Sequence, residues 1–212
     1  MLSHMSRTVP SRMGFVLAGG KSSRMDAGPG KDKAFLEFGG QTLLDRALAV
    51  MGTVCDRVAI VGDPAKFRNY ESVVPDIFPG CGPLAGIHAA LLHSSAELNL
   101  MLAVDMPFVS RELLAFLFAA AEESDAIVTV PRSGKGLQPL CAVYRCDFSL
   151  AAEQALRTGK YKIDAVFSSV SVRLIEEGEL AAAGFSERSF FNVNTPQDRV
   201  AAEGRLSRAG ET

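Results

Sequence analysis

The amino-acid sequence predicts an α/β fold: a single-domain, Rossmann-like, doubly wound sheet whose strands are mostly parallel. Two observations lead to this fold class. Short apolar or β-branched runs alternate with longer stretches of helical period, which is the order that successive βαβ units produce. The run LNLMLAV at Leu98–Val104 lacks the polar alternation of a half-exposed strand, so we expect it to be a central parallel strand.

The strands are expected where short apolar runs end at turn-forming residues. A helix is expected to begin at Thr42, because Asp45 follows three residues later as in a capping box and an apolar stripe comes next. Ser110 is a second expected N-cap. The expected strands are Gly14–Gly19, Arg57–Val61, Leu98–Val104, Asp125–Val130 and Leu140–Tyr144, and the further helices are Leu84–Leu92 and Ser110–Glu123.

After Tyr144 the pattern predicts a helix near Phe148–Arg157, a second helix after Lys162, a short strand in SVRLI and a helix after FFNVNTP. A length of 212 residues with 48% hydrophobic residues fits one domain with one core. We expect residues 1–13 to be a disordered leader, residues 14–204 to form the domain, and residues 205–212 to be a loose tail.

Composition argues against several classes of protein. A net charge of −2 gives no basic face for nucleic acid or for an anionic membrane. No apolar run approaches the ~20 residues of a membrane span, and the first residues lack the apolar region of a secretory signal. The cysteines form no C-x-x-C pair and have no histidine at zinc-ligand spacing, so we expect no structural metal site and a reducing, cytoplasmic location.

The stretch LAGGKSSRMDAGPGKDKA at residues 17–34 follows the first expected strand. It is not a P-loop, because Phe15 stands where the first glycine belongs, and it is not a dinucleotide fingerprint, because Lys33 stands where the third glycine belongs. Gly19 and Gly20 still allow the backbone to approach an anion closely. Between residues 21 and 33 the cations Lys21, Arg24, Lys31 and Lys33 oppose only Asp26 and Asp32. A phosphate ligand is therefore favoured over a solvated loop, which is the alternative.

Asp105 is the second candidate, because it follows the buried strand and the ligand crevice of such sheets lies at the carboxyl ends of the strands. It is expected to bind Mg²⁺, the alternative being a carboxylate bonded to the next helix. Asp76 precedes the Gly/Pro-rich segment Gly82–Gly86 and is either a crevice residue or a turn aspartate. His88 and His93 are interpreted as structural or solvated, and no Ser–His–Asp set is recognisable.

Several motifs occur in an order that resembles the molybdenum cofactor guanylyltransferases, which belong to the nucleotidyltransferase superfamily. These motifs are LAGGKSSRM with KDKA, PGCGPLAG, AVDMPF, QPLCAVYR and FNVNTP. The resemblance extends from about Gly14 to Arg199 and is specific as a combination. It implies a fold of the nucleotide-diphospho-sugar transferase type and transfer of GMP from GTP to the terminal phosphate of molybdopterin (Mo-molybdopterin), with Mg²⁺ as cofactor and release of pyrophosphate.

The resemblance also implies roles for single residues. Lys33 would bind the phosphates of the nucleotide, Asp76 would contact it, and Asp105 would bind both nucleotide and Mg²⁺. Lys33, Asp105 and Arg24 are thus the expected catalytic residues. Backbone contacts are expected from Leu17, Ala18, Gly19, Gly20 and Gly82, and the molybdopterin side is expected at Gln138, Asn192 and Asn194. Charge alone suggests Arg157, Lys160 and Lys162 for the molybdopterin phosphate, the alternative being a solvated helix end.

One departure from the family pattern is the longer spacer DAGPGK between Met25 and Asp32, where Asp26 replaces an expected glycine. Two alternatives stay open beside the guanylyltransferase. The first is a cytidylyltransferase or a sugar-phosphate nucleotidyltransferase, whose phosphate machinery would look the same. The second is a non-catalytic nucleotide-binding module that delivers the cofactor, for which molybdoenzyme apoproteins or their chaperones are candidate partners.

Overall fold

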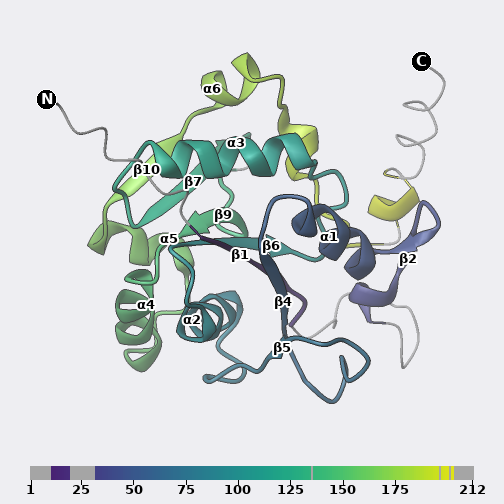
Figure 1. Cartoon of the computed structure of the whole chain (residues 1–212), viewed down its shortest axis with the longest axis horizontal. Coiled ribbons are helices and arrows are strands. Elements are labelled where there is room, and N and C mark those ends of the chain that lie inside the picture. Colours follow the sequence, from purple (N-terminus) through teal and green to yellow (C-terminus); the bar gives the residue numbers. More distant parts are fainter. Residues whose placement is uncertain (1–10, 20–31, 135, 196, 201, 203–212) are drawn as a thin grey trace, which may run out of the picture.

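The protein is built around one mixed sheet, seen in the computed structural model, which describes residues 11–19, 32–134, 136–195, 197–200 and 202 (Figure 1). The order of its strands is β10-β7-β9-β6-β1-β4-β5, and β8 pairs with β7 outside this row. The bounds are β1 Arg12–Leu17, β4 Arg57–Val61, β5 Val73–Val74, β6 Leu98–Ala103, β7 Val128–Ser133, β8 Gly136–Leu137, β9 Cys141–Tyr144 and β10 Val172–Ile175.

Most neighbouring strands in this row are parallel, as the sequence predicts. Strand β1 lies between β6 and β4 and is parallel to both. Strand β9 is the antiparallel member of this row, between β6 and β7, while β10 is parallel to β7. Since β6 has neighbours on both sides and all six of its residues are buried, the prediction of a central strand there is confirmed. The expected parallel pairing holds with β1, whereas the pairing with β9 is antiparallel.

Helices cover both faces of the sheet, which confirms the doubly wound layer. Helices α1 and α3 lie over one face, and α2 and α4 lie over the other (Figure 1). The helix bounds are α1 Leu43–Gly52, α2 Pro83–His93, α3 Arg111–Glu122, α4 Phe148–Arg157, α5 Ile163–Val166 and α6 Glu177–Ala182, with 3₁₀ turns η1 Lys33–Phe35, η2 Phe167–Ser169 and η3 Glu187–Phe190.

The two covered faces explain why the central strands are apolar throughout. In β6, Leu100 and Leu102 belong to the core beneath α1 and α3, whereas Met101 belongs to the core beneath α2 and α4. In β1, Val16 and Phe15 divide between the two cores in the same way. Successive side chains of a strand point to opposite faces, so both sets must be apolar when both faces are covered.

The predicted helix starts are confirmed by their caps. The Thr42 hydroxyl oxygen accepts from the Asp45 backbone N–H at 3.0 Å, and the Ser110 hydroxyl oxygen accepts from the Leu113 N–H at 3.3 Å. Each side-chain oxygen satisfies one of the N–H groups that the first turn leaves without a helical partner.

Some strand bounds differ from those predicted. Strand β1 begins at Arg12 rather than Gly14, because Arg12 and Met13 pair with β6. Strand β7 begins at Val128 rather than Asp125, because the Ser124 hydroxyl binds the Ala126 N–H and holds a local turn instead. The two-residue strands β2 Glu37–Phe38, β3 Gln41–Thr42 and β5 are too short to produce a readable alternation.

No helix in the described part of the chain has the length and hydropathy that crossing a bilayer requires.

Candidate active site

The candidate site lies at the edge of the sheet where the central parallel strands end. Ala18 and Gly19 follow β1, Asp105 follows β6, and Asp76 follows β5. Two segments distant in sequence join them there, namely the turn η1 that carries Lys33 and the segment that carries Asn192 and Asn194. The structure thus brings Asp105, Lys33 and both asparagines together, although residues 33 and 194 are 161 positions apart.

Asp105 is held from three sides. One carboxylate oxygen, Oδ1, accepts from the Asn192 side-chain amide at 3.0 Å, and the other lies 3.5 Å from the Lys33 ammonium. Its backbone carbonyl accepts from the Val193 N–H at 2.8 Å. The Asp105 and Lys33 side chains are only 17% and 20% exposed. Both charges are therefore partly withdrawn from water. In this partly buried position they attract an added charged ligand more strongly than they would on the open surface.

Lys33 is aimed by its own local structure. The Asp32 carboxylate caps η1 by accepting from the Ala34 N–H at 2.9 Å, and Ala34 is the buried residue of this turn. The Lys33 ammonium then reaches the Asn194 side-chain oxygen at 2.8 Å. Its contact with Asp105, at 3.5 Å, is longer than its hydrogen bond to Asn194. The ammonium can therefore still donate to a further anionic partner.

The backbone at residues 17–19, where β1 ends, is closely packed by its neighbours; it is called the β1 end below. The Ala18 N–H donates to the Val61 carbonyl at 3.0 Å, and the Leu17 carbonyl accepts from the Val104 N–H at 3.2 Å. Helix α2 approaches closely, since a Cβ on Gly86 would lie 3.3 Å from the side chains of both Leu17 and Val61. The glycine therefore allows α2 to rest against the strand ends beside Ala18 and Gly19.

Asp76 lies beside the β1 end. Its Oδ2 atom is 3.9 Å from the position that a Cβ on Gly19 would take, and its Oδ1 atom is 3.7 Å from the position of a Cβ on Gly86. Although the residue is exposed as a whole, partial burial of the carboxyl raises the pKa of Asp76. A carboxylate in this place can accept hydrogen bonds from a ligand but repels phosphate oxygens.

Gly82 precedes α2 with φ 76° and ψ −164°, a conformation that favours glycine, and α2 then starts at Pro83 without a side-chain cap. Phe78 lies in the loop before α2, and the Arg157 guanidinium carbon is 5.8 Å from the centre of its ring. Arg157 also pairs with Glu153 at 2.7 Å, so its charge is used within α4 and against this loop. Lys160 and Lys162 follow α4 and are exposed.

The described hydrogen bonds of the Gln138 side chain involve neither Asp105 nor Lys33, Asn192 or Asn194. Its side-chain amide donates to the Ser133 hydroxyl at 2.9 Å and to the Gly136 carbonyl at 3.3 Å, within the connection between β7 and β9. This connection nevertheless reaches the same edge of the sheet, because the Leu140 carbonyl accepts from the Ala103 N–H at 2.8 Å.

A divalent cation could be held by Asp105. The Oδ1 atom accepts from the Asn192 amide, whereas among the described residues Oδ2 has only the 3.5 Å contact with Lys33, so a hard anionic oxygen is available at this edge of the sheet. Among the described residues no three acidic, histidine or cysteine side chains cluster into a metal site. The set fits Mg²⁺, which commonly takes one or two carboxylates and completes its shell with phosphate oxygens and water.

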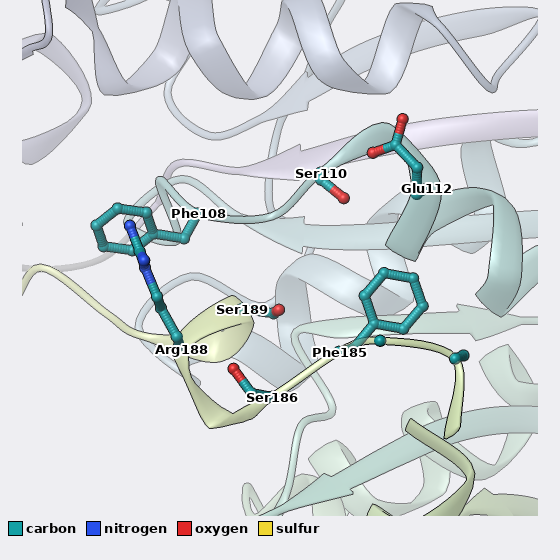
Figure 2. Close-up of a pocket in the computed structure, with 9 residues that line it drawn as sticks. Phe108, Ser110, Glu112, Phe185, Ser186, Arg188 and Ser189 are labelled. Atoms are coloured by element: carbon teal, nitrogen blue, oxygen red, sulfur yellow. The ribbon is translucent and has the colours of Figure 1, made fainter. Parts of the chain in front are cut away.

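Two features were not predicted from the sequence. One is a pocket of about 450 Å³ beside the AVDMPF segment. Figure 2 shows the Arg188 side chain next to Phe108 in its lining, and the guanidinium lies 5.1 Å from the centre of the Phe108 ring. The second feature is Lys66, whose ammonium donates to the Ala18 carbonyl at 3.3 Å and pairs with Asp32. Neither has a sequence signal, because both depend on contacts between distant segments. The pocket is lined by Phe108, Ser110, Glu112, Ala183, Gly184, Phe185, Ser186, Arg188 and Ser189.

Gly20 and Arg24, together with Lys21, Lys31 and the spacer after Met25, lie outside the described residues. Their expected phosphate contacts therefore stay predictions.

Known proteins resemble this chain over most of its length. The family model described as the MobA-like NTP transferase domain matches residues 14–172. A probable molybdenum cofactor guanylyltransferase from Pelotomaculum thermopropionicum is 41% identical, over 89% of this chain and 90% of its own. The molybdenum cofactor guanylyltransferase from Desulfosudis oleivorans is 34% identical, over 91% of this chain and 95% of its own.

Among solved structures, the molybdopterin-guanine dinucleotide biosynthesis protein A from Archaeoglobus fulgidus superimposes with a TM-score of 0.79 at 28% identity. The match covers 93% of this chain and 99% of that one, so the fold agrees from end to end of the solved relative.

Proposed function

The chain belongs to the molybdenum cofactor guanylyltransferases, a family of MobA-like nucleotidyltransferases, and from this premise we propose that it transfers GMP from GTP to the terminal phosphate of molybdopterin and releases pyrophosphate. The observation that carries the proposal is the convergence of Lys33, Asp105, Asn192 and Asn194 at the carboxyl edge of the sheet. That edge is where open α/β sheets bind their ligands.

The reaction needs charge neutralisation more than proton transfer. A terminal phosphate of molybdopterin attacks the α-phosphorus of GTP, the bond to the β-phosphate bridging oxygen breaks, and pyrophosphate leaves. The attacking oxygen is already deprotonated at neutral pH, so no general base is required. Lys33 is the described cation that supplies fixed positive charge beside Asp105, and it acts by holding the phosphates in line and stabilising their charge.

Asp105 would hold Mg²⁺ through its carboxylate, with Asn192 fixing the orientation of that side chain. The cation, when bound, supplies Lewis-acid neutralisation of the phosphate oxygens. Asn192 and Lys33 keep the carboxylate aligned in its absence, so the ligand oxygen is oriented beforehand.

The nucleotide seat is proposed at the backbone of Leu17, Ala18, Gly19 and Gly82. Asp76 faces this seat and is an acceptor without a hydrogen to donate, so it suits the N–H groups of a guanine or the hydroxyls of a ribose. This placement keeps its negative charge away from the phosphates, which Lys33 attracts.

Molybdopterin is proposed to lie on the other side of Asp105, against Asn192, Asn194 and Gln138. Amide side chains both donate and accept, which suits the mixed polar edge of a pterin.

The four cysteines are free thiols, which agrees with a reducing compartment. A cytoplasmic location, and molybdoenzyme apoproteins or their chaperones as partners, are further proposals.

Replacing Asp76 with asparagine should affect GTP affinity and the stability of the fold in different ways. The raised pKa means that ionisation of Asp76 costs native-state stability at pH values above its folded pKa, and the cost disappears as the pH falls through that pKa. We therefore expect Asp76→Asn to have an unfolding temperature at pH 7 equal to or above that of the wild type, while its GTP affinity falls about 10-fold through the lost charged acceptor. Thermal unfolding and GTP titration of both proteins measure this, and a lower unfolding temperature with unchanged affinity would contradict it.

Nucleotide preference is tested by a thermal-shift panel of GTP, CTP, UTP and ATP with Mg²⁺. A ligand that binds the native state stabilises it by mass action, so GTP should raise the unfolding temperature most. A larger shift with CTP or UTP would favour a cytidylyltransferase or a sugar-phosphate nucleotidyltransferase instead.

A further inference from the structure

Lys66 occupies an unusual position between the two ends of one segment. It lies in the loop after β4, and its ammonium donates to the carbonyl of Ala18 at 3.3 Å. The same ammonium forms an ion pair with the Asp32 carboxylate. Ala18 directly precedes residues 19–31 and Asp32 directly follows them, so one cation holds the residues on both sides of that glycine-rich stretch.

The surroundings of the ammonium make these contacts more than a surface ion pair. The Lys66 nitrogen lies 4.5 Å from the centre of the Phe67 ring and 6.0 Å from that of Phe35. The Lys66 and Asp32 side chains are 22% and 26% exposed. Partial withdrawal from water strengthens both the ion pair and the cation–π contacts relative to their values on an open surface.

The position of Lys33 depends on the same pair. Asp32 uses Oδ1 to cap η1 through the Ala34 N–H and presents Oδ2 to Lys66. The capped turn sets the direction in which the next residue, Lys33, leaves the backbone toward Asp105 and Asn194. Lys66 therefore connects the Ala18 end of the nucleotide seat to the phosphate-binding lysine.

We propose that Lys66 is a positioning residue for GTP binding: it holds Ala18 and Asp32 at a fixed separation and so places Lys33 against the triphosphate. The inference rests on the proposed function, because it assigns Lys66 to the same nucleotide site. It acts through Asp32, which distinguishes it from a lysine that contacts phosphate directly.

The test measures GTP affinity in the absence of molybdopterin, with Mg²⁺ present, for the full chain. Lys66→Met should raise the dissociation constant about 10-fold, the effect expected from losing hydrogen bonds to a charged group. Lys66→Arg should retain most of the affinity, since the guanidinium keeps the charge and can bind a carboxylate with two donors. Arg68→Met is the matched control, because it removes a cation from an exposed position in the same loop and should leave the affinity unchanged.

A double-mutant cycle with Asp32→Asn identifies the route. Asparagine keeps an N-cap oxygen for η1 but loses the charge that pairs with Lys66. If Lys66 acts through Asp32, Lys66→Met combined with Asp32→Asn should weaken GTP binding no more than the stronger single change. Effects that multiply in the double variant would overturn the proposal, as would a Lys66→Met protein with wild-type affinity.

Failure of the inference is distinguishable from failure of the function. If Lys33→Ala weakens GTP binding but Lys66→Met does not, the nucleotide site stands and the role of Lys66 is wrong. If the wild-type chain shows no preference for GTP, both are wrong. Should Lys66→Met unfold at the assay temperature, Asp32→Asn decides the question, because it keeps the side-chain size and the N-cap oxygen but removes the charge that pairs with Lys66. Weaker GTP binding then supports the proposal, and wild-type affinity overturns it.

Discussion

Asp105→Asn is expected to lower Mg²⁺-dependent guanylyl transfer by about 100-fold or more, the scale on which removing an electrostatic catalytic group acts. Asparagine keeps the shape of the side chain and an oxygen that can still accept from Asn192. It loses the negative charge that would hold Mg²⁺ and that lies beside the Lys33 ammonium. Initial rates at saturating GTP and molybdopterin over a range of Mg²⁺ concentrations measure the effect.

The matched control for this change is Asp125→Asn, which removes the same charge from an exposed residue before β7. Its activity should equal that of the wild type, and both variants should unfold at temperatures close to the wild-type value. Full activity in Asp105→Asn, with the fold intact, would show that the carboxylate has no part in the reaction.

Lys33→Ala is expected to lower kcat/KM for GTP by about 100-fold, because the proposed charge-assisted contact of this partly buried lysine with the triphosphate would be lost. The loss should be seen as a higher KM for GTP, a lower kcat or both. Steady-state kinetics with GTP as the varied substrate separates these possibilities. Arg68→Ala removes an exposed cation elsewhere and should leave both constants unchanged.

Removing Lys33 leaves Asp105 with its hydrogen bond from Asn192 and with partial access to water, so the variant should stay folded. Because Asp105 is retained, the variant should also retain Mg²⁺ dependence. Kinetic constants identical to those of the wild type would place the phosphate site away from η1 and would require a different reading of the KDKA segment.

The fold could be predicted because hydrophobic pattern reports directly on burial. The apolar run that became β6 is apolar on both faces since α1 and α3 cover one side and α2 and α4 cover the other. The helix starts at Thr42 and Ser110 were readable because a cap is a local interaction between residues three apart. The short strands β2, β3 and β5 were not, since two residues contain no period.

The site was predictable only in part, because sequence patterns report interactions between near neighbours and the site is assembled from distant segments. Spacing and charge indicated Asp105 and the region of Lys33 as separate features, whereas the contacts of Asn192 with Asp105 and of Asn194 with Lys33 span 87 and 161 positions. Family resemblance suggested these asparagines; no local pattern could. Lys66 was missed altogether, because its partners Ala18 and Asp32 belong to other segments and the sequence around it resembles an ordinary loop.

The measurement that tests the central claim most directly is pyrophosphate release by the purified chain supplied with GTP, Mg²⁺ and molybdopterin. The account predicts that release requires all three, that it is accompanied by an equimolar product carrying GMP on the terminal phosphate of molybdopterin, and that CTP replaces GTP poorly. Tight GTP binding without pyrophosphate release would contradict the account and favour a module that carries the cofactor without chemistry.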